Sequence, residues 1–344
     1  MTRLLRIFSQ KIITERMTDM ADNQKNAGIL GKVLLGAGGL AAVGAGTSYG
    51  VSEYFFRRTI IRQNARVERT MKMAGTAWDE YMPLIKERHK WVDEHCRMIE
   101  VDIMSADNLK LHAYYYPVGD RKKTIICFHG YTSSGRNDFN SIAKFFIEMG
   151  YSLLCVDERA HGKSEGKYIG FGCLDRFDAL EWINYVKKQT GDDAVIFLYG
   201  ISMGGATVLM TSGQNLDPAV KGIISDCAFT SAWDVFSWVL KSMYHMPEFP
   251  VMYISDMMCR QRAGYGLKEC NSAEEVKKAK VPILFIHGDA DTFVPCRMCG
   301  EIYANCASPK EKIIIKGAGH AESYYRDTEL YESAVRGFID KYAD

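Results

Sequence analysis

AVIFLYGISMGG, residues 194–205, joins six apolar or aromatic residues to a serine that glycines flank. The six residues predict a buried β-strand, and the apolar pattern after Gly205 predicts a helix. Ser202 therefore lies between a strand and a helix, with Gly200 and Gly204 completing a GxSxG pattern. This context is typical of a tight turn that exposes a nucleophilic serine. The alternative is a glycine-rich turn in which the serine only caps the helix.

A serine hydroxyl becomes a strong nucleophile only when a base takes its proton. Three histidines follow Ser202 in the chain, namely His245, His287 and His320. His245 lies in an apparent insertion, and His287 ends a predicted strand ahead of the candidate acids. Because His320 follows the glycines of GAGH, just past the last predicted strand, a flexible loop could bring it over the serine. We predict that His320 is the base.

Two acids lie between the serine and this histidine, in IHGDADTFVP at residues 286–295. An acid is needed to hold the imidazole in the correct tautomer and to stabilise its protonated form. Asp289 and Asp291 are both candidates, and the alternative role for Asp289 is that of a turn residue that bonds its own backbone.

Backbone N–H groups usually stabilise the oxyanion that forms when a serine attacks a carbonyl group. Met203 directly follows the serine, and Tyr131 directly follows the pair His129-Gly130 at the end of a predicted strand. We expect the N–H groups of Tyr131 and Met203 to form the oxyanion hole. We expect His129 to be structural, and the charged residues of DERAHGKSEG at 157–166 to fix loops.

Beyond Cys96, short β-rich runs alternate with longer helical patterns. This alternation predicts an α/β fold with a mostly parallel, eight-stranded sheet and helices on both faces. The first two strands are expected to form a hairpin. The predicted strands are 97–104, 109–116, 124–128, 152–157, 194–199, 220–225, 283–287 and 312–315, and the main predicted helices are 138–149, 176–188 and 330–342.

The composition favours neither a polyanionic partner nor a metal. With 43 Lys and Arg against 42 Asp and Glu, the formal charge is +1, so we expect no nucleic-acid partner. The ten cysteines are expected to be reduced thiols, because Cys127 and Cys155 lie in predicted central strands. Cys296 and Cys299 lack a second pair or a histidine cluster that would complete a zinc site, so we expect no metal.

The first 95 residues differ from the rest of the chain. Residues 33–51 carry no charge and could cross a bilayer, although six of the nineteen are glycine. The alternative is a glycine-rich or amphipathic lead-in. Arginines are denser after this run than before it, which favours a cytoplasmic downstream domain. We therefore expect residues 1–95 to hold a membrane anchor and linking helices, and residues 96–344 to form the main domain.

Several motifs occur together in one order: HGY at 129–131, DERAHGKSEG, GISMGG, HGDADTFVP and GAGH. Over residues 96–344 the chain resembles the membrane-anchored α/β hydrolases of the Bem46-like group, many of them bacterial and described as esterase-like or peptidase-like. The resemblance implies the α/β-hydrolase fold, a Ser-His-Asp triad, an acyl-enzyme and no cofactor. The similar HGxxDxxVP pattern of these hydrolases implies that Asp291 is the acid. Arg-Ala-His-Gly at 159–162 departs from the Arg-Gly-His-Gly of many relatives.

The family does not share one substrate, so the fold and the triad do not name it. Residues 229–271 predict a helical cap rich in Met and aromatic residues, which suits flexible apolar ligands, although such residues can also simply pack the cap onto the domain. We expect a serine hydrolase of carboxylic esters or thioesters with acyl or lipid-like substrates. The alternatives are a serine aminopeptidase-type peptidase, which requires an acidic pocket for a free amine, and a non-catalytic hydrolase-like binding protein.

Overall fold

The computed structural model describes residues 46–62, 76–119, 121–269 and 271–343. The chain divides into two compact units, Met1–Ser52 and Glu53–Asp344. In the first unit, residues 46–52 are helical. Among the described helices, none combines the length and the apolar character that crossing a bilayer requires. Most of the predicted anchor at 33–51 falls outside the described residues, so the anchor and the division at residues 95 and 96 stay predictions.

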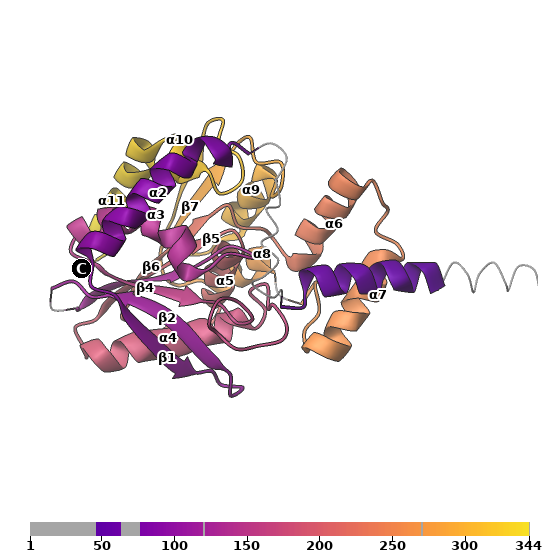
Figure 1. Ribbon diagram of the computed structural model, residues 1–344, viewed down its shortest axis with the longest axis horizontal. Coiled ribbons are helices and arrows are strands. Elements are labelled where there is room, and N and C mark those ends of the chain that lie inside the picture. The colour runs from indigo at the N-terminus through magenta and orange to yellow at the C-terminus, as the bar shows by residue number, and fades with distance from the viewer. Residues whose placement is uncertain (1–45, 63–75, 120, 270, 344) are drawn as a thin grey trace, which may run out of the picture. The chain divides into compact units, whose positions relative to one another are not determined.

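The second unit is built on one eight-stranded sheet (Figure 1). The strand order is β1-β2-β4-β3-β5-β6-β7-β8. β1 pairs antiparallel with β2, and β2 pairs antiparallel with β4, while all the other neighbours are parallel. The strands are β1 (Ile99–Met104), β2 (Lys110–Tyr116), β3 (Lys123–Phe128), β4 (Ser152–Asp157), β5 (Val195–Ile201), β6 (Val220–Asp226), β7 (Ile283–Gly288) and β8 (Lys310–Ile315). The predicted mostly parallel sheet and its initial hairpin are confirmed.

Helices cover both faces of the sheet (Figure 1). On one face, side chains of α2, α3 and α11 share a buried cluster with the strands. On the other face α4 packs on α5, α5 on α8, and α8 on α9. These helices are α2 (Trp78–His95), α3 (Gly135–Glu148), α4 (Asp175–Thr190), α5 (Met203–Thr211), α8 (Ser272–Glu275), α9 (Cys296–Asn305) and α11 (Thr328–Tyr342); a short α10 (Ser323–Arg326) precedes α11.

The burial of the strands explains why the sequence predicted them. Every residue of β4 and β7 is buried, as expected for parallel strands covered on both faces, whereas β1 at the edge alternates between half-buried and exposed residues. α3 begins three residues before its predicted start at residue 138. The reason is Ser134, whose hydroxyl accepts the Asn137 N–H and caps the helix.

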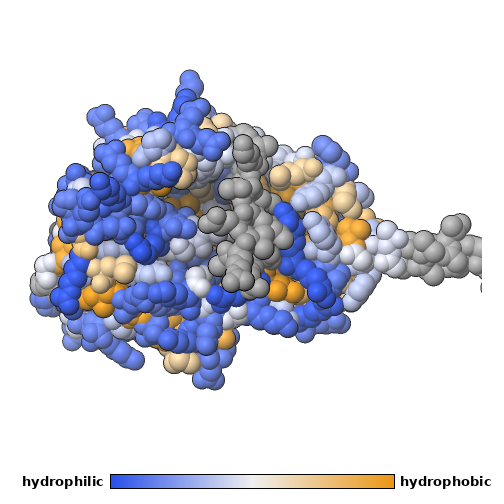
Figure 2. Space-filling view, viewed as in Figure 1, coloured by the Kyte–Doolittle hydropathy of each residue, from blue (hydrophilic) through white to orange (hydrophobic). Residues whose placement is uncertain are grey.

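The long connection between β6 and β7 carries several helices. They are α6 (Ala232–Tyr244), α7 (Val251–Met258), the π-helical turn η1 (Cys259–Ala263), α8 and the 3-10 turn η2 (Val276–Lys278). Figure 2 shows a mostly hydrophilic face on which hydrophobic residues are interspersed over α6 and α7. In this region Met243, Phe249, Tyr253 and Met257 are exposed.

Candidate active site

Ser202 lies in a tight turn between β5 and α5. Its backbone has a φ of 55° and a ψ of −111°, a conformation that L-residues rarely adopt. A Cβ on Gly204 would overlap the Phe128 carbonyl, and one on Gly200 would overlap the Gly204 carbonyl. The turn therefore requires both glycines, as the GxSxG pattern predicted. The Ser202 N–H donates to the Asp226 carbonyl at 2.8 Å, which ties the turn to the end of β6.

The structure brings Ser202, His320 and Asp291 together at the carboxyl ends of the strands. The Ser202 Oγ lies 2.8 Å from His320 Nε2, and His320 Nδ1 lies 2.7 Å from Asp291 Oδ2. All three side chains are buried. Because the Asp291 carboxylate can only accept from Nδ1, the imidazole presents Nε2 as the acceptor of the serine proton. The arrangement can activate a serine for attack on a carbonyl carbon.

Asp291 and Asp289 occupy different environments, although two residues separate them. The Oδ1 of Asp291 accepts the N–H groups of Phe293 and Val294 at 2.9 and 2.8 Å. Burial opposes the ionisation of Asp291, yet the charge of His320 and hydrogen bonds from His287 and His320 hold its pKa well below the usual range.

Asp289 is exposed, and its Oδ1 accepts the Gly317 N–H at 2.6 Å. Asp289 thus ties the loop after β7 to the loop that carries His320, rather than bonding its own backbone. Bonds to nearby backbone, the alternative role considered for Asp289, are made by Asp291.

Two buried groups near these residues were not singled out as part of the site. The His287 Nε2 lies 2.8 Å from the Val294 carbonyl and 3.4 Å from Asp291 Oδ2. Burial acts to lower the pKa of His287, but Asp291 raises it well above normal. Asp226 ends β6 and accepts from Ser323 Oγ and the Tyr331 hydroxyl, both at 3.1 Å. Asp226 is the last residue of β6 and His287 the last but one of β7, at the same edge of the sheet as Ser202, and this placement was present in the sequence as a signal.

The predicted oxyanion donors belong to the two loops beside Ser202. Met203 is the first residue of α5, so its N–H is among those that a helix leaves without an intrahelical acceptor. Tyr131 follows β3 and lines the same pocket as Ser202. The N–H groups on either side of it are engaged, that of Gly130 by Asp138 Oδ2 at 2.7 Å and that of Thr132 by His161 Nε2 at 3.3 Å.

The predicted scaffold residues hold loops together. The His129 Nε2 accepts the Glu158 N–H at 3.0 Å. Arg159 forms a buried ion pair with Asp178 at 2.6 Å and reaches Asp107 at 3.0 Å. Burial lowers the pKa of His161 to about 3, with the neighbouring His129 contributing. The described residues include no cluster of three or more His, Cys, Asp or Glu side chains that could hold a metal ion.

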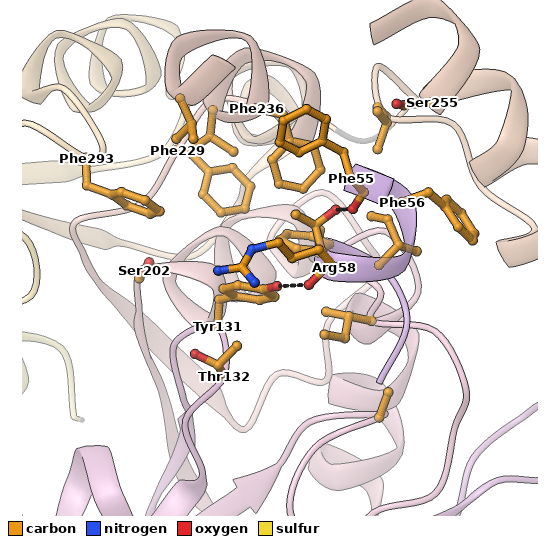
Figure 3. Close-up of a pocket in the computed structure, with 18 of the residues that line it drawn as sticks. Phe55, Phe56, Arg58, Tyr131, Thr132, Ser202, Phe229, Phe236, Ser255 and Phe293 are labelled. Carbon is orange, nitrogen blue, oxygen red and sulfur yellow. Dashed lines mark hydrogen bonds between the residues drawn. The ribbon is translucent and has the colours of Figure 1, made fainter. Parts of the chain in front are cut away.

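Ser202 opens onto a cavity of about 880 Å³ (Figure 3). This volume is near the upper end of ordinary ligand pockets, at roughly 300–1,000 Å³. The lining combines the loops after β3, β4, β6 and β7 with α6, α7 and the segment 53–62. Its apolar members include Phe55, Phe56, Tyr131, Phe171, Phe229, Phe236, Leu240, Tyr244, Val251, Met252 and Phe293. Segment 53–62 was predicted to be part of the N-terminal region and not of the site.

Comparisons with known proteins agree with this fold. Residues 123–249 match the family model described as the alpha/beta hydrolase fold. YqkD of Bacillus subtilis is 28% identical over 242 residues, which cover 70% of this chain and 79% of YqkD. Bem46 of Schizosaccharomyces pombe is 24% identical over 217 residues, which cover 62% of this chain and 67% of Bem46.

Among solved structures, an esterase from Pyrococcus furiosus superposes with a TM-score of 0.62 at 23% sequence identity. The superposition covers 74% of this chain and 94% of the esterase. Together with the sheet order and the strand-turn-helix around Ser202, these matches identify the chain as a member of the α/β-hydrolase superfamily, similar to Bem46 and YqkD.

Proposed function

We propose that this protein hydrolyses carboxylic esters or thioesters through Ser202, His320 and Asp291. The observation that carries the proposal is the pair of contacts at 2.8 and 2.7 Å that links the three side chains at the floor of an apolar pocket. A serine that only capped α5 would have no need of a buried histidine and carboxylate in line with it. The capping role is also unsupported, because no side-chain cap bond of Ser202 to α5 is found.

The proposed reaction has two halves. Ser202 Oγ attacks the carbonyl carbon while His320 Nε2 takes the hydroxyl proton, and the N–H groups of Met203 and Tyr131 bind the oxyanion. The tetrahedral intermediate collapses, His320 gives the proton to the departing alcohol or thiol, and the acyl group stays on Ser202. Water then attacks the acyl-enzyme with His320 as base, which releases the carboxylic acid and restores the serine.

We further propose that α6 and α7 form the cap of this site and receive the acyl chain. Phe236 on α6 packs edge-to-face on Phe171 at 4.9 Å, and both line the pocket with Leu240. An apolar cavity of this size suits an acyl chain. None of the described lining residues is Asp or Glu, which disfavours a peptidase that must bind a free amine.

Labelling with a fluorophosphonate tests the nucleophile. The wild-type protein is expected to be labelled, and Ser202→Ala is expected to lose both labelling and hydrolysis of p-nitrophenyl esters. Ser242→Ala is the matched control, because its exposed hydroxyl has one described bond, to the Trp238 carbonyl of its own helix. Labelling that persists in Ser202→Ala would refute Ser202 as the nucleophile. A wild type that neither reacts nor hydrolyses any ester would favour the non-catalytic binding protein.

We also propose that residues 33–51 anchor the chain in a membrane with the hydrolase unit on the cytoplasmic side. The uncharged run and the arginines after it support this proposal. Carbonate extraction of membranes that contain the full-length protein tests it. Retention in the pellet is expected, and release into the supernatant would refute the anchor.

A further inference from the structure

The segment 53–62 brings positive charge into the pocket. Arg58 is half-buried and lines the same cavity as Ser202. Figure 3 shows its guanidinium extending over Tyr131 in the direction of Ser202. The segment belongs to the N-terminal region of the chain, outside residues 123–249, which match the family model.

The charge of the lining is one-sided. Arg58 and Arg62 both line the cavity, while its described lining includes no Asp or Glu. Arg62 directs its guanidinium to backbone carbonyls, since Nη1 donates to Ser164 and Nη2 to Gly162. In a pocket whose walls are otherwise largely apolar, a cation acts at a lower effective dielectric than in water and attracts an anion more strongly.

Arg58 is carried by a fixed piece of backbone. The Tyr131 hydroxyl donates to the Arg58 carbonyl at 3.1 Å, a bond drawn in Figure 3. Just after it, the Ile60 carbonyl accepts the Ile169 N–H at 2.8 Å, and the Arg62 N–H donates to the Lys167 carbonyl at 2.9 Å. Phe56 and Ile60 are almost fully buried on either side of Arg58. The backbone that carries the Arg58 side chain is therefore fixed beside the pocket before a ligand arrives, which reduces the entropy lost on binding.

We propose that Arg58 binds an anionic group, a carboxylate or a phosphate, of the ester or thioester that reacts at Ser202. A guanidinium donates two parallel hydrogen bonds to either group, which gives both attraction and orientation. The substrate then combines an apolar chain with one anionic group. The inference rests on the proposed function, and it adds the residue that selects the substrate class.

Two matched pairs of substrates test this inference. Mono-p-nitrophenyl adipate and p-nitrophenyl hexanoate share a six-carbon acyl chain and differ in a terminal carboxylate. 1-Hexanoylglycerol 3-phosphate and 1-hexanoylglycerol differ in a phosphate on the alcohol side. We expect a higher kcat/KM for the anionic member of at least one pair, and the pair that shows it identifies the group and the side of the ester.

The readout is the ratio of kcat/KM within a pair, because general damage to the enzyme lowers both members equally. Arg58→Gln should lower the ratio at least about tenfold, the low end for a hydrogen bond to a charged group. Arg58→Lys, which keeps the charge but not the fork, should fall between. Arg57→Gln is the control, because Arg57 is 70% exposed and pairs with Glu53, and it should leave the ratio unchanged.

A ratio that Arg58→Gln leaves unchanged, or a wild type that prefers the neutral member of both pairs, would overturn the inference while the proposed hydrolysis stands. A wild type without any hydrolysis would instead overturn the proposed function. In that case titration of hexyl phosphate and hexanol onto Ser202→Ala still tests Arg58. Tighter binding of hexyl phosphate that Arg58→Gln abolishes supports the inference, and equal binding of the two refutes it.

Discussion

Replacing Asp291 by Asn tests the acid assignment most directly. The substitution keeps the size of the side chain and removes its charge. The amide oxygen of Asn can still accept the N–H groups of Phe293 and Val294, which Asp291 Oδ1 accepts at 2.9 and 2.8 Å. The NH2 group then faces His320 Nδ1 at the 2.7 Å contact and donates to it. The imidazole is driven to the tautomer that carries its proton on Nε2, where it cannot accept the proton of Ser202.

The expected loss follows from that change of tautomer. A wrong tautomer in a serine triad with intact geometry lowers kcat by about 10⁴-fold, or about 5 kcal/mol of barrier. Initial rates with p-nitrophenyl butyrate at pH 8 would measure it, and the melting temperature of each variant would exclude unfolding as the cause.

Asp289→Asn is the matched control. Asp289 is exposed, and its one described contact is with the Gly317 N–H, which an Asn oxygen also accepts. We expect its kcat to stay within about tenfold of wild type. The reasoning is refuted when Asp289→Asn loses several orders of magnitude and Asp291→Asn does not.

Three further predictions concern the turn, the pocket and a buried acid. Gly204→Ala should lower the melting temperature and abolish activity, because its Cβ would overlap the Phe128 carbonyl. Gly300→Ala in α9 has open space around the new Cβ, so it should raise the free energy of unfolding by up to about 1 kcal/mol. Thermal unfolding of the two variants and the wild type measures both effects. Phe236→Ala should raise the relative kcat/KM of p-nitrophenyl esters with longer acyl chains, and an unchanged chain-length profile would place the acyl chain elsewhere. Burial raises the pKa of Asp226 to about 6, so the folded state binds the carboxyl proton more tightly than the unfolded chain does. The contribution of Asp226 to the free energy of unfolding therefore falls by up to about 3 kcal/mol as pH rises from about 4 to about 6. Urea unfolding at pH 4.5 and pH 7 should show that loss in wild type and a smaller one in Asp226→Asn; equal losses would contradict the assignment.

The amino-acid sequence by itself determined the sheet and most of the turn at Ser202. β4 begins and ends at the predicted residues 152 and 157, and β6 begins at the predicted residue 220. Strands buried on both faces have largely apolar sequences, as the LLCV of β4 does. The need for glycine at 200 and 204 was predicted from the GxSxG pattern. A Cβ on Gly200 would overlap the Gly204 carbonyl within the turn, and one on Gly204 would overlap the Phe128 carbonyl at the end of β3. The first residues of helices were predicted less accurately. α3 begins before its predicted start because its N-cap, Ser134, lies outside the apolar pattern that the prediction used.

Only the tertiary structure decided which groups meet across long separations in the chain. On the residues alone, Asp289 and Asp291 were equivalent, and the preference for Asp291 came from a resemblance; what separates them is burial and the direction of each side chain after β7. Segment 53–62 has an ordinary helical pattern, and nothing in it indicates that Arg58 faces the pocket of Ser202. Local sequence specifies a strand, a turn or a helix because the forces are local, whereas the neighbours of a side chain in the pocket depend on how distant elements pack.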